Sequence, residues 1–263
     1  CRPYVGPGDV GPSTSLVIDD RYSAVINLPF NFPFYGASYP SLVASTNGYL
    51  SFDVSLTGGF ADWSLASGNV PNTNYDGALV MGPWHDLDPS LTTSPNQKIK
   101  YNVIGSAPNR KWVLSFYKVP LFSAACNNLI ENTHQIILHE SSGVIEVFVF
   151  DKQQCPGWNT GRAMIGLQDI TKTKAIMAPG RTATDAPWGT VGMNESWRFI
   201  PKNGTTLYQS VELLDASGTS IATGDTTSID SVTFETTFPN ICPPSGNSLY
   251  VIKTTYKKID DPT

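Results

Sequence analysis

Charged side chains are scarce in this sequence: Asp, Glu, Lys and Arg make up 15% of its 263 residues, against about 25% in an average soluble domain. The formal net charge is −5, and basic residues cluster no further than pairs such as Arg110-Lys111 and Lys257-Lys258. A protein that binds nucleic acid or an anionic membrane surface needs a basic stripe. We therefore expect no nucleic-acid partner.

Long apolar runs, CxxC pairs and the GxSxG motif are also missing. A membrane-spanning helix needs about 18 apolar residues in succession, so we predict no membrane insertion. Zinc and thioredoxin-like sites usually use CxxC pairs, and many serine hydrolases use GxSxG. The three histidines, His85, His134 and His139, are scattered. These absences favour a protein that is not an enzyme.

Uninterrupted stretches suitable for long helices are absent as well. Glycine (22 residues) and proline (20 residues) recur throughout, and the longest segment without either is 121–142. Both residues interrupt helices. Aromatic residues, at 11%, argue against a disordered chain. The composition therefore predicts an all-β fold.

Several segments alternate apolar and polar residues with the period of two that is typical of strands. In 111–117 the apolar side chains of Trp112, Leu114 and Phe116 share one face. The segments 135–138 and 144–150 flank a short loop that contains glycine, which is a common hairpin connection. We therefore predict a hairpin there.

Phenylalanine occupies every second position of 30–34 and so lies on one face of a predicted strand. Pro29 and Pro33 lack a backbone N–H, which suits an edge strand better than a central one. Further along, Asn47-Gly48 is a typical tight turn between two strands.

The composition changes near residue 201, and tryptophan and histidine do not occur beyond it. Strand-like segments follow at 205–214, 231–238 and 249–256. We divide the chain into a large β-domain, 1–200, and a small one, 201–263. About 60 residues is small for an independent β-domain, so we expect the second to be incomplete or packed on the first, within a longer parent protein.

Four cysteines are widely spaced: Cys1, Cys126, Cys155 and Cys242. An even number with long spacings is typical of disulfides in an oxidising compartment, and four cysteines allow three connectivities. We predict Cys126–Cys155, because both lie in polar loops that flank the predicted hairpin, and Cys1–Cys242 by elimination. Buried free thiols are the alternative.

The densest polar cluster contains Asp86 and Asp88, whose spacing points two carboxylates to one side of a strand. Carboxylates with loop carbonyls suit Ca²⁺, which is the one metal that the sequence indicates. The alternative is that the aspartates cap a turn. A second acidic pair, Asp19-Asp20, is expected to form a local turn or salt bridge.

Trp63, Trp158 and Trp188 lie in segments that contain glycine or proline and are predicted to be loops. Exposed aromatic rings on loops stack on sugar rings or anchor a protein partner. Packing beneath the loops is the alternative. Trp112 and Trp197 lie in strand-like segments and are predicted to be core residues.

Glycoside hydrolysis needs two opposed carboxylates, and Asp86 or Asp88 with Glu140 or Glu146 would supply them. A secreted carbohydrate-binding or glycan-hydrolysing protein is therefore the alternative to a binding module. A purely structural spacer in a long stalk is a third interpretation.

Six segments in order carry a resemblance to a known family. They are LPFNFPFYG (28–36), STNGYLSF (45–52), ALVMGPWHDLDP (78–89), PNRKW (108–112), QIILHE with GVIE (135–146) and IGLQ (165–168). This order, over roughly 15–200, resembles NIDO-like (nidogen-type) extracellular modules. It is most similar to those of large Bacteroidetes surface adhesins, which are exported by the type IX secretion system and often linked to gliding motility.

The resemblance implies an antiparallel β-sandwich for 1–200, followed by an Ig-like β-domain in 201–263. It also implies a non-catalytic adhesion module in a large secreted protein at the cell surface and associated with the outer membrane. Apart from the Ca²⁺ indicated by Asp86 and Asp88, we expect no cofactor. The implied partners are a surface protein or glycan and the secretion machinery. Residues 179–199 extend beyond the general family pattern.

Overall fold

The computed structural model describes residues 16–126, 128–185, 187–201, 206–228, 234–238 and 250–258. The chain forms two compact units, with the boundary between Ile200 and Pro201. The helices of the described residues are three short 3₁₀ turns: η1 Val54–Leu56, η2 Ala124–Cys126 and η3 Asn159–Gly161. None of the described helices is both long enough and apolar enough to cross a membrane. The predicted all-β class is confirmed.

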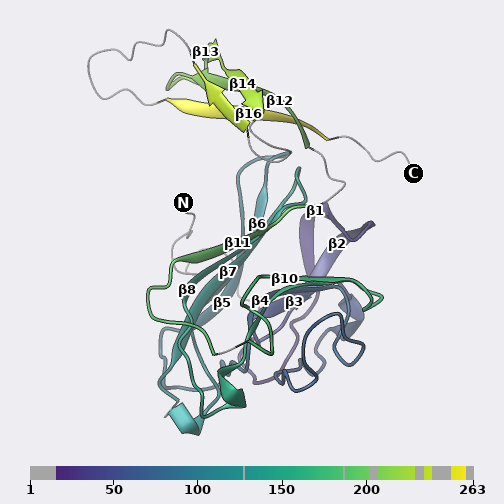
Figure 1. Cartoon of the computed structure of the whole chain (residues 1–263), viewed down its shortest axis with the longest axis vertical. Coiled ribbons are helices and arrows are strands. Elements are labelled where there is room, and N and C mark those ends of the chain that lie inside the picture. Colours follow the sequence, from purple (N-terminus) through teal and green to yellow (C-terminus); the bar gives the residue numbers. More distant parts are fainter. Residues whose placement is uncertain are drawn as a thin grey trace. The chain divides into compact units, whose positions relative to one another are not determined.

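The first unit consists of two antiparallel sheets (Figure 1). The six-stranded sheet runs in the order β1 (Ile26–Phe34), β2 (Ala37–Ala44), β3 (Tyr49–Ser51), β4 (Leu79–Trp84), β9 (Met164–Gln168) and β10 (Ala175–Met177). The five-stranded sheet runs in the order β11 (Glu195–Phe199), β8 (Ile145–Asp151), β7 (Glu131–His139), β6 (Lys111–Pro120) and β5 (Lys98–Ile104).

The main hydrophobic core lies between these two sheets. Every second residue of β1 from Ile26 to Phe34 is buried, and so are Trp112, Leu114 and Phe116 of β6. Residues from both sheets belong to one hydrophobic cluster. The sheets therefore pack face to face, and the predicted antiparallel β-sandwich is confirmed.

A second hydrophobic cluster covers the outer face of the six-stranded sheet. Tyr49, Leu79 and Met81 of the sheet pack there with Leu65 and Tyr75 of the long connection between β3 and β4. All six residues of β4 are buried. Burial on both faces explains why this strand is a continuous apolar run in the sequence and does not alternate.

The local strand predictions are confirmed. β1 is an edge strand of its sheet, and β7 pairs with β8 as a hairpin. Asn47-Gly48 joins β2 to β3, and Gly48 has a φ of +85°. A Cβ at Gly48 would lie 2.5 Å from the carbonyl oxygen of Pro83, so only glycine lets this turn approach the end of β4.

The second unit contains a three-stranded sheet in the order β13 (Ser220–Thr223), β12 (Thr206–Leu214) and β16 (Val251–Lys258), and a separate ladder of β14 (Asp225–Ser228) with β15 (Phe234–Thr237). All of these pairs are antiparallel. β12 and β16 correspond to predicted strands, and β15 to the described part of a third. The Ig-like character of this unit stays a prediction.

Candidate functional site

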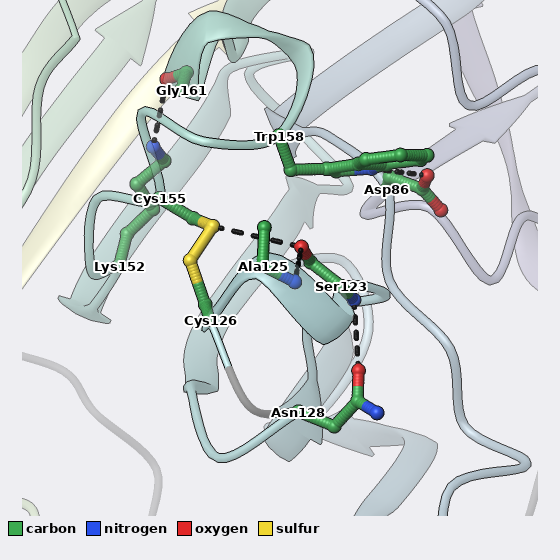
Figure 2. The surroundings of a disulfide bond; sticks show 9 residues. All are labelled: Asp86, Ser123, Ala125, Cys126, Asn128, Lys152, Cys155, Trp158 and Gly161. Atoms are coloured by element: carbon green, nitrogen blue, oxygen red, sulfur yellow. Dashed lines mark hydrogen bonds between the residues drawn. A yellow bond between two sulfur atoms is a disulfide. The ribbon is translucent and has the colours of Figure 1, made fainter.

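The predicted disulfide between Cys126 and Cys155 is confirmed, with the two Cα atoms 6.1 Å apart (Figure 2). It ties the loop before β7 to the loop after β8. Ser123 Oγ lies 3.8 Å from Cys155 Sγ. Cys1 and Cys242, the other predicted pair, lie outside the described residues.

Three aromatic side chains, Trp63, Phe122 and Trp158, form a partly exposed group that we call the aromatic shelf. The rings of Trp63 and Trp158 stack with centroids 5.9 Å apart and an interplanar angle of 23°. Phe122 meets Trp158 edge to face at 5.5 Å and is 38% exposed. Two of the three tryptophans singled out in the sequence therefore lie together.

The surrounding structure fixes the shelf from two sides. Phe122 and Trp158 lie on the two loops that the disulfide joins, each a few residues from a cysteine. Trp63 follows Asp62, whose carbonyl oxygen accepts hydrogen bonds from Trp84 Nε1 at 2.9 Å and from Tyr49 Oη at 3.1 Å. The shelf is thus held by covalent and hydrogen bonds before any ligand arrives.

Trp188, the third tryptophan, is buried with 6% of its surface exposed. Its Nε1 donates to the carbonyl oxygen of Ala163 at 3.1 Å. Lys152 Nζ lies 4.8 Å from the ring centroid, and the Arg181 guanidinium lies 4.5 Å from it. Trp188 therefore packs in the core, as the alternative interpretation had it. Trp112 is also buried, and Trp197 packs against the same core.

Three carboxylates meet beside the shelf: Asp19, Asp20 and Asp86, which we call the acid cluster. One oxygen from each can be chosen so that all three lie within 4.8 Å of one another. The fully buried Asn47 holds this arrangement. Its Nδ2 donates to Asp20 Oδ1 at 2.9 Å, and its Oδ1 accepts from the backbone N–H of Leu87 at 2.9 Å.

Asp88, which the sequence paired with Asp86, has a different role in the structure. Its Oδ1 accepts hydrogen bonds from the backbone N–H of Ser90 at 2.8 Å and from Ser90 Oγ at 2.6 Å, so it caps a turn. Its charge still contributes to raising the pKa values of Asp19, Asp20 and Asp86. The carboxylates that gather with Asp86 are those of Asp19 and Asp20, which the sequence assigned to a local turn or salt bridge.

Burial governs the electrostatics of the acid cluster. Burial first, and the neighbouring carboxylates second, raise the pKa of Asp86 to about 8 and that of Asp19 to about 7. The pKa of Asp20 is raised by the same two causes, although the Asn47 hydrogen bond opposes them. Within the described part of the chain, no cationic side chain forms a salt bridge with any of the three.

A small pocket lies against Asp86 and Trp158 and is also lined by His85, Lys152 and Arg162. Burial lowers the pKa of His85 to about 3, so the ring is neutral. Burial also lowers the pKa of Lys152 to about 8, and its Nζ donates to the carbonyl oxygen of Trp188 at 2.9 Å. Asp86 is therefore the acidic residue among these five side chains.

The two glutamates considered for glycoside hydrolysis are held in ion pairs. Arg110 Nε donates to Glu140 Oε2 at 2.8 Å. Glu146 accepts from His139 Nε2 at 2.7 Å and from Arg198 Nε at 2.8 Å. Each carboxylate links neighbouring strands or loops of the five-stranded sheet. We therefore assign both glutamates a structural role.

The sequence matches the model of a family described as NIDO related over residues 5–209. No curated protein and no solved structure matches the chain significantly. The matched range includes all described residues of the first unit, with the aromatic shelf and the acid cluster.

Proposed function

The chain belongs to the NIDO-related family, and from this premise we propose that its first unit is a non-catalytic extracellular binding module that acts in adhesion. The family and the Cys126–Cys155 disulfide both support an extracellular protein, because disulfides persist in oxidising compartments. The ligand is a glycan or a protein on another surface.

The aromatic shelf is the observation that carries this proposal. Rigid, partly exposed aromatic rings supply large contact areas and are common anchors of binding interfaces. The disulfide holds Phe122 and Trp158 in place in the free protein, so binding loses little entropy in ordering them. Trp63 and Trp158 already stack on each other, and their partly exposed surface is available to a sugar ring or an apolar side chain.

The test is binding of the whole chain to a glycan array and to immobilised surface proteins. Phe122→Ala removes the most exposed ring of the shelf and is expected to reduce binding at least about tenfold, as hot-spot truncations do. Phe150→Ala is the matched control, since Phe150 is similarly exposed, at 42%, on β8. Equal binding by both variants and the unaltered chain would reject the shelf as the binding surface.

The second candidate function is hydrolysis of a glycan. One observation favours it: burial raises the pKa of Asp86 to about 8, and a general acid must stay protonated at neutral pH. A reducing-sugar assay with polysaccharide substrates decides between the two functions. Turnover that Asp86→Asn abolishes would replace the binding module by a hydrolase.

Surface display in a Bacteroidetes parent, export by the type IX secretion system and a role in gliding motility form the finer part of the proposal. The order of sequence motifs supports it. The prediction is that the parent protein reaches the cell surface in cells with an intact type IX system and accumulates in the periplasm of cells without one. Surface display in both strains would refute this export route.

A further inference from the structure

The acid cluster has the geometry of a site for one hard cation. Asp19-Asp20 and Asp86 come from distant parts of the sequence, and Asn47 brings the two loops together. Calcium–oxygen distances are about 2.3–2.6 Å, so two oxygens on opposite sides of one ion are roughly 5 Å apart. Three carboxylate oxygens within 4.8 Å of one another therefore fit around a single ion.

A second observation is that one buried oxygen of this cluster lacks a hydrogen-bond partner among the described residues. Asp19 Oδ1 is buried and accepts no hydrogen bond from the described residues. Asp86 is only 3% exposed, and its carboxylate receives one hydrogen bond in the described structure, from Trp158 to Oδ2. Buried acceptors without a donor cost about 1–3 kcal/mol each, and more when they are charged. A bound cation would remove this cost.

Protonation of the carboxyl groups explains the acid cluster less well than a bound cation does. A shared proton would join two of the carboxyl groups through a short hydrogen bond. The described residues show no hydrogen bond between the side chains of Asp19, Asp20 and Asp86, and Asp20 Oδ1 accepts instead from Asn47. The group that would balance the three carboxylates is therefore one that coordinates several oxygens at once.

We propose that Asp19, Asp20 and Asp86 bind one divalent cation of the calcium type, and that this cation fixes the aromatic shelf for ligand binding. The donor set consists of oxygens alone, which hard cations prefer and zinc or copper do not. Loops of irregular shape suit Ca²⁺ better than the strict octahedron of Mg²⁺. The second half of this inference rests on the proposed function of the shelf.

Asp86 connects the cation to the shelf. The side chain belongs to the acid cluster, and its Oδ2 accepts the indole N–H of Trp158 at 2.8 Å (Figure 2). A cation that holds the Asp86 carboxylate also holds the hydrogen-bond acceptor that orients Trp158. Loss of the cation releases the Asp86 side chain from the other two aspartates, so the acceptor for Trp158 is less well fixed, and we expect tighter ligand binding in calcium than in chelator.

Terbium luminescence tests the cation site in the whole chain. Tb³⁺ replaces Ca²⁺ at oxygen sites, and a nearby indole sensitises its emission; Trp158 is hydrogen-bonded to a proposed ligand. We expect sensitised emission that Ca²⁺ displaces and that excess Mg²⁺ displaces poorly. Calorimetric titration with Ca²⁺ alone should show one site.

The variants Asp19→Asn and Asp20→Asn should each weaken Ca²⁺ binding at least about tenfold, because affinity depends on the number of charged ligands. Asp185→Asn is the matched control, since Asp185 is an exposed carboxylate outside the cluster. Circular dichroism establishes that each variant is folded. Absence of Ca²⁺ binding by the folded, unaltered chain, or equal loss in all three variants, would overturn the cation site.

Ligand binding measured in Ca²⁺ and in chelator separates this inference from the proposed function. Binding of equal strength in both conditions would overturn the link between cation and shelf and leave the binding module intact. Cation binding without any ligand on the shelf would support the site and reject the proposed function. We expect ligand binding to weaken at least about tenfold in chelator. Loss of the groups that support a metal site reduces metal affinity or activity by a similar factor.

Discussion

Trp158 Nε1 donates a 2.8 Å hydrogen bond to Asp86 Oδ2, and this bond joins the aromatic shelf to the acid cluster. The hydrogen bond spans a large separation in sequence, between the segment after β4 and the loop after β8. It places a buried carboxyl group against a partly exposed ring. A substitution in the aromatic shelf should therefore affect the acid cluster, and a substitution in the acid cluster should affect the shelf.

The first prediction concerns the Trp158→Phe substitution, which keeps an aromatic ring and removes the indole N–H. The buried Asp86 carboxylate then loses its donor, and we expect the free energy of unfolding in chelator to fall by about 1–3 kcal/mol. Urea denaturation followed by circular dichroism measures it.

Trp63→Phe is the control for this prediction, because the Trp63 indole N–H has no hydrogen-bond partner among the described residues. It removes a similar area of the shelf and should cost less than Trp158→Phe. Equal losses in the two variants would mean that ring area, and not the bond to Asp86, determines the effect.

The second prediction concerns the Cys126–Cys155 disulfide. The bond closes a loop with a sequence separation of 29, and the chain-entropy relation gives about 3–4 kcal/mol for a loop of this length. The double variant Cys126→Ser/Cys155→Ser should lose that much stability in urea denaturation. It should also bind shelf ligands more weakly, because Phe122 and Trp158 lie on the released loops. Unchanged stability would contradict the assignment of the bond as a structural one.

Much of the sandwich could be predicted because strand burial leaves a local pattern. The alternation in β1 and β6, the Asn47-Gly48 turn and the hairpin of β7 and β8 each depend on a few neighbouring residues. The disulfide could be predicted for a related reason, since its two cysteines flank that hairpin. Such features need no knowledge of the distant parts of the chain.

The candidate site depended on contacts that no local pattern records. Asp19-Asp20 was visible as an acidic pair, but its approach to Asp86 depends on Asn47, which bonds to both loops. Phe122 gave no signal at all, since a lone apolar residue in a loop is equally typical of a core position. Trp188 was a candidate binding residue because its neighbours in the sequence are typical of a loop. Its burial depends on contacts with Lys152 and Ala163, which are distant in the sequence.

The third prediction concerns Gly189, which packs against the loop after β8. Its φ is +128°, and an added Cβ would lie 1.8 Å from the carbonyl oxygen of Lys152. The backbone must move to accommodate Gly189→Ala, and we expect a loss of more than about 3 kcal/mol in thermal or urea unfolding, the range of severe backbone strain.

Gly192→Ala is the control for Gly189→Ala. Gly192 also has a positive φ, +65°, but an added Cβ there would meet nothing within 4 Å. The expected loss is about 1–2 kcal/mol, from the left-handed conformation alone. A loss in Gly189→Ala no larger than in Gly192→Ala would contradict the close approach of Gly189 to Lys152.

The last prediction concerns the loss of folding stability at acidic pH. Burial by itself raises the pKa of Glu146, but the hydrogen bonds from His139 and Arg198 outweigh it and lower the pKa to about 2. The unfolded chain titrates near the usual glutamate value of about 4.3. The unfolded state thus binds the proton more readily, so stability falls as the pH drops from about 5 to about 2.

Glu146→Gln should remove this part of the pH dependence. At neutral pH the variant should be less stable than the unaltered chain by about 1–3 kcal/mol, and the difference should shrink as the pH approaches 2. Glu131→Gln is the control, because Glu131 forms a more exposed pair with Lys118 at 3.4 Å, and such pairs contribute about 0–1 kcal/mol. Parallel stability curves for Glu146→Gln and the unaltered chain would show that Glu146 titrates alike in the folded and unfolded states, and that its two partners do not stabilise its charge.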